Sequence, residues 1–531
     1  MPFRSDYTKE TLDFYLWGHR AIDVKQSWDE GFEGDEIIVA VLDTGVDGTH
    51  PDLVGQVIEG YRPKSGQIIQ ASSDSSFGGS HGTHVAGIIA AKKDGKGIVG
   101  VAPKVKIMPI VIFDEGGWYV GDDFTAKGII WAVDHGAKIL SNSWGGPGYS
   151  QLLKDAFDYA FERNVLVVAA AGNSTSSQSF MYPANYPGVI QVGAAEYNGG
   201  DIKTANFSNR SPSLSISAPG VDILSTMPQE YSYGYDKDSF LSNDNNGYYG
   251  FMSGTSMATP YVSGLVALLL QKYPQAKPWQ IKGLIEKSAL DIDEPGVDEK
   301  SGYGLLQAKA VKADIPLSGG TNFFVKVTDA YESWNIPSVF ITLIGTSENG
   351  RVVRYFAKTN KDGVAKFYNI PTGKYDIFLG GPDSQEKTTV SSLPNVCIRK
   401  SEERFIRLER VVESEFENIL IKLKSSAILT LISKPAKIIV HFEKKKNSGE
   451  IFIEKSVDFS TIQSYDFSEL SGKYRIKVSL PEKAASNLKI NGEITLNGKV
   501  IAVNGTILKD STETILSDNV SEWWTVFGNG Q

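Results

Sequence analysis

Residues 37–45 read Ile-Ile-Val-Ala-Val-Leu-Asp-Thr-Gly, so that six apolar residues run directly into an aspartate. A short apolar run rich in β-branched residues predicts a strand that is buried on both faces. Similar runs recur along the first part of the chain, with amphipathic stretches of helical spacing between them. The runs lie at 106–113, 138–142, 165–170 and 189–192, and the helical stretches at 123–135, 151–163 and 259–273. This alternation predicts an α/β domain with a mainly parallel sheet flanked by helices.

The pattern changes after residues 313–322, a stretch that carries Pro316 and a pair of glycines. From there on, short alternating strands are separated by turn residues, and helical spacing largely disappears. A length of 531 residues fits three or four domains at about 150 residues each. We therefore expect an α/β domain over 1–316 and two all-β sandwich domains over 317–411 and 412–531. Within the first sandwich, residues 361–379 resemble transthyretin-like or carboxypeptidase-regulatory-like sandwiches.

Charge and composition exclude several classes of protein. The net charge is −9, and the first 316 residues hold 37 acidic against 25 basic residues. This disfavours nucleic acid as a partner, because phosphate binding needs a clustered basic face. The longest apolar runs, 165–171 and 265–270, fall far short of the ~20 residues that a membrane-spanning helix needs. The single cysteine, Cys397, excludes an internal disulfide and a cysteine-based zinc site.

Three polar residues stand where an open α/β sheet builds its sites. Asp43 follows the first predicted strand, at the carboxyl edge of the sheet. His81 opens His-Gly-Thr-His-Val-Ala-Gly over 81–87, and Ser256 lies in Gly-Thr-Ser-Met-Ala-Thr-Pro over 254–260, just ahead of a long helix. Singly, each has an ordinary structural interpretation: a turn aspartate, a structural histidine and a helix N-cap. Together, in the order Asp, His, Ser, they favour catalysis by an activated serine.

These motifs, their order and their flanks resemble the subtilisin family of serine proteases over about residues 13–312. The resemblance implies that Ser256 attacks the scissile carbonyl, that His81 takes and returns the proton, and that Asp43 orients the histidine and stabilises its charge. It also implies that Asn173 donates to the oxyanion together with the backbone N–H of Ser256. The expected activity is that of a serine endopeptidase that acts through an acyl-enzyme.

The same resemblance implies a substrate-binding region. Residues 143–146 resemble the family's extended peptide-binding segment, along which a substrate backbone pairs as an added strand. Residues 170–172 would form the other wall of the pocket for the residue before the cut. Met181 falls where a small residue often lines the pocket floor, so the depth of the pocket stays open. Trp118 and Tyr119 either cap more distant subsites or pack on their own loop. The expected pocket residues are Ser143, Trp144, Gly145, Ala170, Ala171, Gly172 and Met181.

A calcium site is also implied, which would stabilise a chain without disulfides. Residues 92–98 match in length the calcium loop of the family. Three carboxylates and three backbone carbonyls would supply the six or so oxygen ligands that calcium favours. The expected ligands are Asp13, Asp52 and Asp94 with the carbonyls of Lys92, Lys96 and Ile98. Considered singly, these aspartates are surface charges. The insertion at 229–251, with Asp236, Asp238 and Asp244, is a second calcium loop, a flap near the active site or a solvated loop.

Two other classes of function remain open from the sequence. A binding or adhesion protein would use the α/β half as a scaffold and the sandwiches to hold a partner. An acyl transferase or lipase could use a similar triad, although the chain order and the missing Gly-x-Ser-x-Gly elbow disfavour it.

For the protease we expect a polypeptide substrate, no nucleic acid, no membrane span and a monomer. The N-terminus shows no apolar leader, which fits a mature extracellular chain whose secretory leader is absent. The sandwich domains would bind substrate or stabilise the catalytic domain. The three-part layout resembles that of a keratin-degrading member of the family.

Overall fold

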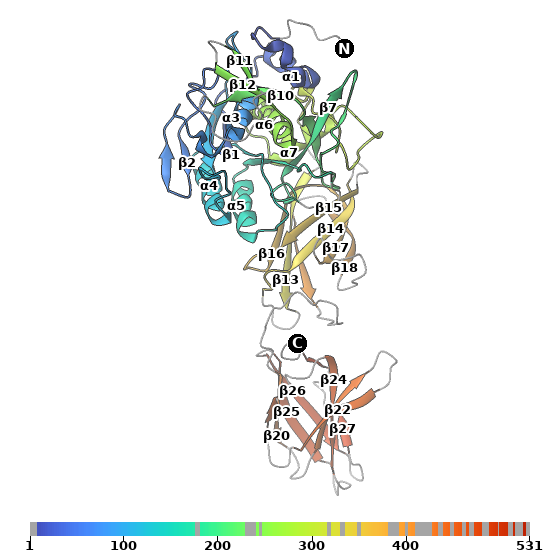
Figure 1. Cartoon of the computed structure of the whole chain (residues 1–531). Helices are drawn as coiled ribbons and strands as arrows, with labels where there is room; N and C mark the ends of the chain where they lie inside the picture. The colour runs from blue at the N-terminus through green and yellow to red at the C-terminus, as the bar shows by residue number, and fades with distance from the viewer. Residues whose placement is uncertain are drawn as a thin grey trace. The chain divides into compact units, whose positions relative to one another are not determined.

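The computed structural model describes most of the α/β half and the strands of two sandwiches (Figure 1). The described residues are 8–175, 181–228, 240–243, 247–315, 320–329, 335–347, 352–380, 392–398, 402–408, 427–433, 439–445, 451–458, 464–466, 472–480, 488–496, 499–507, 513–515 and 524–526. The chain divides into two compact units, Met1–Thr328 with Asn335–Ile406, and Asp329–Trp334 with Arg407–Gln531. The first unit therefore joins the α/β half to the first sandwich. The expected domain boundaries at 316/317 and 411/412 lie outside the described residues.

The α/β half is built on a sheet of nine described strands. Its order is β3 (Gln67–Ile69), β2 (Gly60–Arg62), β4 (Lys106–Val111), β1 (Ile38–Asp43), β5 (Ile139–Asn142), β6 (Leu166–Ala170), β7 (Ile190–Asn198) and β8 (Asp201–Thr204), with β9 (Ile216–Pro219) also paired to β7. The central pairs are all parallel, and only β3 and β8 run antiparallel to their neighbours. The predicted α/β class with a mainly parallel sheet is confirmed.

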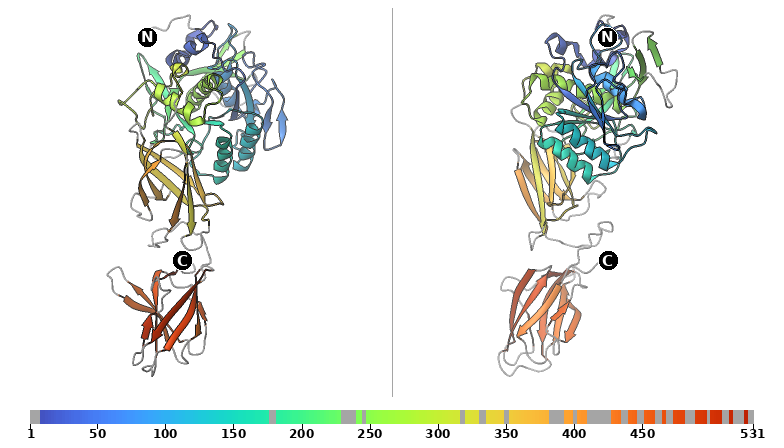
Figure 2. Two further views of the ribbon diagram at one scale, coloured as in Figure 1. Left: turned by 180° about the vertical axis from the view of Figure 1, so that it is seen from behind. Right: turned by 90° about the vertical axis from the view of Figure 1, so that its left-hand side faces the viewer.

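Helices cover both faces of this sheet (Figures 1 and 2). Successive side chains of β1 point to opposite faces: Val39 and Val41 belong to one hydrophobic core, and Ala40 and Leu42 to the other. The first core is covered by α1 (Trp17–Ile22), α2 (Lys25–Asp29), α3 (His81–Ala90), α6 (Thr255–Lys272) and α7 (Pro278–Ser288), and the second by α4 (Asp122–Asp134) and α5 (Gln151–Glu162). Short 3-10 turns occur at η1 (Asp13–Tyr15), η2 (Ser76–Gly78) and η4 (Ala308–Lys312).

A smaller sheet lies in the region of the insertion at 229–251. Its order is β10 (Ile223–Met227), β12 (Gly247–Met252) and β11 (Phe240–Asn243), and both pairs are antiparallel. Asp236, Asp238 and Asp244 lie outside the described residues. The alternatives of a second calcium loop, a flap or a solvated loop therefore stay open.

The first sandwich consists of two facing sheets. One contains β16 (Val364–Pro371), β13 (Gly320–Asp329) and β19 (Glu402–Leu408); the other contains β15 (Val352–Lys358), β14 (Phe340–Ser347), β17 (Gly373–Leu379) and β18 (Ser392–Ile398). Alternate side chains of these strands are fully buried, as at Phe323, Leu343 and Ile377. Burial of every second residue is what a two-layer sandwich requires.

The second unit is also a sandwich. Its sheets contain β23 (Ser464–Asp466), β20 (Ala427–Ser433), β25 (Leu488–Leu496) and β26 (Lys499–Ile507), and β22 (Ile451–Asp458), β21 (Ile439–Lys445), β24 (Gly472–Ser479) and β27 (Glu513–Ile515), with β28 (Trp524–Val526) paired to β24. Two alternate residues of β24, Ile476 and Val478, are buried. The expected class of two all-β sandwiches after the α/β half is thus confirmed.

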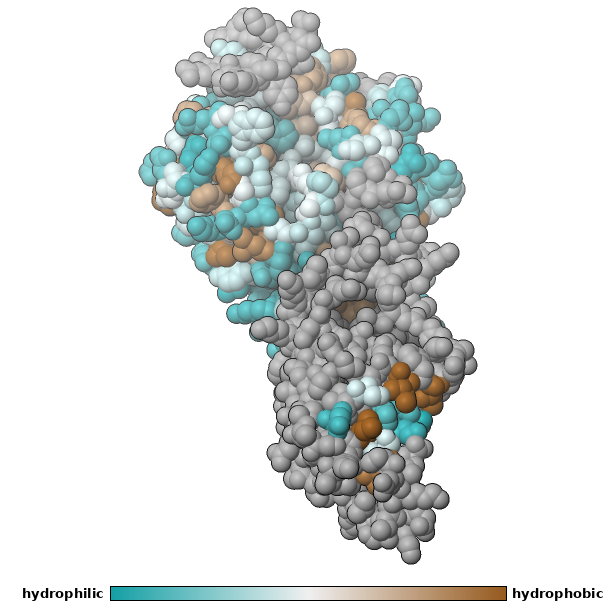
Figure 3. Space-filling model, turned by 60° about the horizontal axis from the view of Figure 1, so that its bottom comes forward, coloured by the Kyte–Doolittle hydropathy of each residue, from teal (hydrophilic) through white to brown (hydrophobic). Residues whose placement is uncertain are grey.

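On the face of the molecule that Figure 3 draws, the hydrophobic side chains of the α/β half are dispersed. Figure 3 shows brown patches over the α/β half that are broken up by teal and white side chains. Among the residues that the structure describes, no helix is both long enough and apolar enough to span a bilayer.

Candidate active site

Two of the predicted site segments leave neighbouring strands at one edge of the main sheet. β1 lies next to β5, and β6 follows β5. In the parallel register Leu42 pairs with Asn142, which in turn pairs with Ala169. The next residues, including Asp43 and Ser143, therefore emerge side by side at the carboxyl ends of the strands, where open α/β sheets place their sites.

His81 and Asp43 form a direct pair. Nδ1 of His81 lies 2.9 Å from Oδ1 and 3.0 Å from Oδ2 of Asp43. The Asp43 side chain is 2% exposed, whereas that of His81 is 25% exposed and so open to a substrate. Burial lowers the pKa of His81, but the charge of Asp43 and its hydrogen bond outweigh this, and the pKa of His81 lies above its ordinary value. The pair has the geometry of a base and its orienting carboxylate.

Thr44 holds this pair in place, a role that the sequence reasoning missed. Its backbone N–H donates to Oδ1 of Asp43 at 2.7 Å. Its hydroxyl donates to the carbonyl oxygen of Gly79 and accepts from the backbone N–H of Gly82, each at 3.0 Å. Thr44 therefore ties the end of β1 to both sides of His81. The sequence signal for this role is the position of Thr44 directly after Asp43.

Ser256 lies in the first turn of α6 and bonds reciprocally with Ser143. The Ser256 hydroxyl donates to the carbonyl oxygen of Ser143 at 3.0 Å, and the Ser143 hydroxyl donates to the carbonyl oxygen of Ser256 at 2.8 Å. That second carbonyl is free because Pro260, four residues later, has no N–H to offer it. The proline of the sequence motif thus leaves an acceptor that fixes the peptide-binding segment to the nucleophile. Hydrogen bonds of a catalytic serine are often poorly aligned before substrate binds.

Asn173 follows β6 and is oriented by Thr255. Its Oδ1 accepts from the backbone N–H and from the hydroxyl of Thr255, both at 2.9 Å. With the oxygen so engaged, the hydrogens of the amide nitrogen are left to donate to another group. A Cβ atom built on Gly254 would lie 3.3 Å from Nδ2 of Asn173 and 3.6 Å from the backbone nitrogen of Ser256. The two expected oxyanion donors therefore border one small space.

Asn209 holds the segment that carries Asn173. It is 2% exposed. Its Nδ2 donates to the carbonyl oxygen of Ala171, and its Oδ1 accepts from the backbone N–H of Ser174, both at 2.9 Å. No motif near Asn209 signalled this role, because the contact joins loops 35 or more residues apart.

The two expected pocket walls meet at Met181. A Cβ atom built on Gly172 would lie 3.1 Å from Cγ of Met181, and one built on Gly145 would lie 3.7 Å from its Cε. Residues 170–172 and 143–145 leave the adjacent strands β6 and β5, which is why their walls face each other. The Trp144 ring stacks on Tyr119, with ring centroids 5.7 Å apart. The structure thus brings Gly145, Gly172 and Met181 together, whereas the Trp144 ring packs on a neighbouring loop.

A comparison with known protein families identifies the family of this chain. The sequence model of the Subtilase family matches residues 34–304, which is about half of the chain. The chain belongs to the subtilase family. Two further models match downstream: the DR_A0283-like, Ig-like domain over residues 315–417, and the second β-sandwich domain of fervidolysin over residues 429–528. This subtilase is therefore a serine endopeptidase.

Individual relatives resemble this subtilase to different extents. Fervidolysin of Fervidobacterium pennivorans is 46% identical over 98% of this chain and 78% of its own length. The minor extracellular protease Epr of Bacillus subtilis is 35% identical over 58% of this chain and 44% of its own length. The crystal structure of fervidolysin, described as a keratinolytic enzyme related to subtilisin, aligns with a TM-score of 0.71 at 42% identity, over 98% of this chain and 81% of that one.

The expected calcium region of the subtilase domain contains one carboxylate that the sequence reasoning missed. Glu10 is 5% exposed, lies against the backbone of Gly95 and Lys96, and leaves its Oε2 buried with no hydrogen-bond partner. Burial and the charge of Asp94 raise the pKa of Glu10 to about 7. Burial, with the charges of Asp94 and Glu10, likewise raises the pKa of Asp52 to about 7. These carboxylates repel one another, and the ammonium of Lys92 lies 3.6 Å from Oδ2 of Asp94.

Asp13 is engaged elsewhere. Its Oδ2 pairs with the guanidinium of Arg20 at 2.5 Å, and its Oδ1 accepts from the backbone N–H and hydroxyl of Thr8 at 2.9 and 2.6 Å. Asp13 as a calcium ligand therefore stays a prediction. Glu10, whose carbonyl oxygen accepts from the backbone N–H of Asp13, is the carboxylate of this turn that lies against the loop at 92–98.

The loop at 92–98 is anchored on both sides. The backbone N–H of Ile98 donates to Oδ2 of Asp52 at 3.0 Å, and the N–H of Lys92 donates to the Asp52 carbonyl at 3.0 Å. Within the described ranges, no three histidine, cysteine or acidic side chains form a metal-binding cluster by themselves. A calcium ion here would therefore depend on loop carbonyls as well as carboxylates, and the orphaned Glu10 oxygen beside buried Asp52 fits such an ion.

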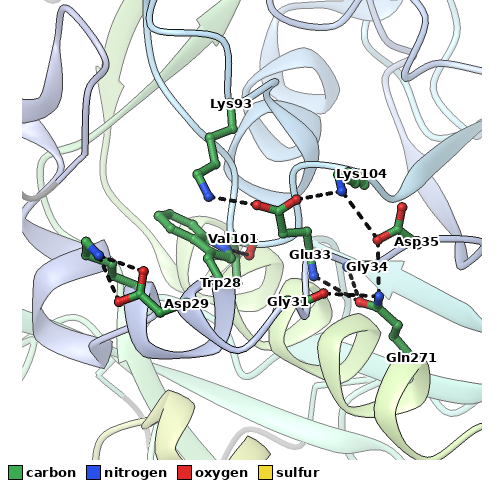
Figure 4. Close-up of polar contacts among 11 residues, drawn as sticks. Trp28, Asp29, Gly31, Glu33, Gly34, Asp35, Lys93, Val101, Lys104 and Gln271 are labelled. Atoms are coloured by element: carbon green, nitrogen blue, oxygen red, sulfur yellow. Dashed lines mark hydrogen bonds and ion pairs between the residues drawn. The ribbon is translucent and has the colours of Figure 1, made fainter.

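An ion-pair network supports the same loop from outside (Figure 4). Lys93 and Lys104 lie 2.7 and 2.8 Å from the two carboxylate oxygens of Glu33. The ammonium of Lys93 also lies 5.0 Å from the ring centre of Trp28. Burial would raise the pKa of Glu33, but the two lysines outweigh it and hold that pKa below its usual range. Gln271 of α6 closes the network by accepting from the backbone N–H of Glu33 at 2.9 Å.

Proposed function

We propose that this subtilase is a secreted endopeptidase that cleaves polypeptides through an acyl-enzyme formed on Ser256. The observation that carries the proposal is the His81–Asp43 pair at the edge where Ser143 holds Ser256. A scaffold for a binding protein would have no need to keep these polar groups together. Its extracellular location is supported by the similarity to a protease named as extracellular.

In the proposed mechanism the Ser256 oxygen attacks the scissile carbonyl while Nε2 of His81 takes the hydroxyl proton. Asp43 accepts the Nδ1 hydrogen bond, which fixes the tautomer and stabilises the charged ring. His81 then passes the proton to the leaving amine as the C–N bond breaks. A water molecule, deprotonated by the same histidine, attacks the acyl group and releases Ser256.

Asn173 and the backbone N–H of Ser256 would stabilise the oxyanion of both tetrahedral intermediates. For Asn173→Ala we expect kcat to fall by about 10²–10³-fold with little change in KM, because the lost bond matters most in the transition state. Steady-state hydrolysis of a peptide p-nitroanilide measures this.

Thr255→Val is the matched control for Asn173→Ala. It keeps the Thr255 backbone N–H on Asn173 Oδ1 and removes the hydroxyl, which donates to the same oxygen and accepts from the backbone N–H of Gly172 at 3.1 Å. We expect a fall in kcat of less than about thirtyfold, because two neutral hydrogen bonds are worth about 2 kcal/mol together. An Asn173→Ala enzyme with unchanged kcat would remove Asn173 from the oxyanion site.

Keratin is the substrate class we propose for this protease. The proposal rests on the resemblance to fervidolysin, a protein described as keratinolytic, along 98% of the chain. Release of soluble peptides from keratin powder, compared with casein, tests it. Release from both substrates that stops after treatment with a serine-directed reagent would support the proposal. Release of peptides from casein alone would mean that keratin is not a substrate and that the enzyme cleaves unfolded proteins.

For calcium we propose a site formed by Asp52, Asp94 and Glu10 together with carbonyls of Lys92, Lys96 and Ile98. A bound ion supplies positive charge that offsets the repulsion between these carboxylates. Since it would bind only the folded state, it adds to the free energy of unfolding by about 3 kcal/mol at one hundred times its Kd. We therefore expect chelation to lower the melting temperature.

Two variants distinguish the expected role of Glu10 as a calcium ligand from that of Asp13 in the ion pair with Arg20. Glu10→Gln should shrink the difference in melting temperature between calcium and chelator, because it removes a carboxylate from the site. Asp13→Asn should lower the melting temperature equally in both conditions, because it breaks only the Arg20 pair. If Asp13→Asn, and not Glu10→Gln, shrinks the difference between calcium and chelator, Asp13 is the calcium ligand. If chelator leaves the melting temperature of the wild type unchanged, the proposed calcium site is wrong.

A further inference from the structure

The first sandwich is packed against the catalytic half at α5. Lys366 of β16 pairs with Glu162 at 2.7 Å, and the Tyr368 hydroxyl donates to the same carboxylate at 3.0 Å. The ring of Tyr368 lies 5.2 Å from that of Phe161. This contact fixes the sandwich to a helix that lies behind the sheet.

A second contact reaches the substrate-binding side through Tyr149. Its hydroxyl oxygen accepts from the backbone N–H of Lys358, the last residue of β15, at 3.0 Å. Its ring meets Phe340, the first residue of β14, edge to face at a centroid distance of 5.1 Å. Two neighbouring strands of the sandwich therefore hold one tyrosine of the catalytic half.

The same ring packs on the other side against a wall of the proposed pocket. Tyr149 meets the rings of Tyr182 and Tyr186 edge to face at 5.1 and 5.3 Å. Tyr182 directly follows Met181 and exchanges two backbone hydrogen bonds with Gly146, at 2.9 and 2.8 Å. Tyr149 is thus one ring away from both the floor residue and the peptide-binding segment.

The pocket wall formed by the segment at 143–150 needs support from residues outside that segment. Residues 143–150 read Ser-Trp-Gly-Gly-Pro-Gly-Tyr-Ser and form neither helix nor strand. Three glycines in eight residues make the segment costly to order, because glycine loses the most backbone freedom on folding. One end is fixed where Ser143 bonds to Ser256, and the other where Ser150 caps α5. Tyr149 is the only large side chain between Trp144 and that cap.

We propose that Tyr149 is a positioning residue through which the first sandwich sets the shape of the pocket for the side chain before the cut. The inference rests on the proposed function. The sandwich would then take part in substrate selection through the catalytic domain, without touching the substrate. Large apolar side chains depend on a well-placed wall, whereas an alanine side chain hardly reaches it. Tyr149 would therefore control how strongly the enzyme prefers a large apolar residue over alanine before the cut.

The test compares kcat/KM of the full chain for two peptide p-nitroanilides that differ only in phenylalanine or alanine before the cut. Titration with a serine-directed reagent gives the concentration of active enzyme. For Tyr149→Ala we expect the Phe/Ala ratio to fall about tenfold. For Tyr149→Phe, which loses only the Lys358 bond and is the safer variant to fold, we expect a fall of about threefold.

Lys366→Met is the matched control, because it weakens the contact at α5 and leaves Tyr149 intact. Its Phe/Ala ratio should equal that of the wild type, even where its melting temperature falls. An unchanged ratio in both Tyr149 variants would overturn the inference, as would an equal change in Lys366→Met. If the wild type hydrolyses neither peptide, the proposed function itself fails, which is a separate result.

Discussion

Ser256→Ala is expected to lower kcat by about 10⁶-fold, the size of the loss when a subtilisin is deprived of its serine. Without the hydroxyl, no acyl-enzyme can form, and only the oxyanion donors and substrate binding continue to favour hydrolysis by water. KM should change little, because the serine side chain contributes little to binding. Hydrolysis of a peptide p-nitroanilide over long incubation measures the residual rate.

A serine-directed reagent supplies the second readout for this variant. The wild type should take up one label per active chain at Ser256, located by mass spectrometry, and Ser256→Ala should take up none. Ser253→Ala is the control: its hydroxyl accepts from the backbone N–H of Asp222, outside the catalytic set, so labelling and rate should match the wild type. A folded wild type that is neither labelled nor active would favour the binding-protein alternative.

Asp43→Asn is expected to lower kcat by about 10⁴-fold, because an amide in place of the carboxylate favours the wrong histidine tautomer and stabilises no charge. The pH profile should also change. His81 acts as a base only when neutral, so activity falls as the pH drops through its pKa. Asp43 holds the pKa of His81 above its ordinary value, so the acid limb of the wild type should lie above about pH 6.5. In Asp43→Asn the midpoint should move to lower pH.

Thr44→Val separates charge from geometry at the same pair. It keeps the Asp43 carboxylate and the backbone bond to it, but removes the hydroxyl that ties β1 to Gly79 and Gly82. Its rate should fall while its acid midpoint stays at the wild-type value. If the midpoint shifts as far in Thr44→Val as in Asp43→Asn, the charge of Asp43 is not what sets the pKa of His81.

Local patterns were sufficient to predict the fold class. The apolar run at 37–42 encodes a strand buried on both faces, and the aspartate after it marks the end of that strand. His81, expected to open a segment where a helix can begin, is the first residue of α3, whereas the helix expected from residue 259 begins at Thr255, so that Ser256 lies in its first turn and not ahead of it. Such features depend on residues close together in sequence, so a single sequence reveals them.

The supporting contacts depended on the tertiary structure. Asn209 reaches Ala171 and Ser174 across loops, and Tyr149 reaches Lys358 across 209 residues. No periodicity encodes contacts of this kind, since they arise only when strands, helices and the sandwich pack together. The sequence also could not join the first sandwich and the α/β half into one unit, because their strand patterns change at 313–322.

The sequence by itself determined which residue types stand at the ends of the strands, and hence the family and the expected chemistry. Only the tertiary structure decided which of several nearby carboxylates stand together. Asp13 and Glu10 are three residues apart in the same turn, yet one pairs with Arg20 and the other faces Asp94. The reason is physical: the partner of a charge is set by distances of a few ångströms in space, and spacing along the chain does not fix these.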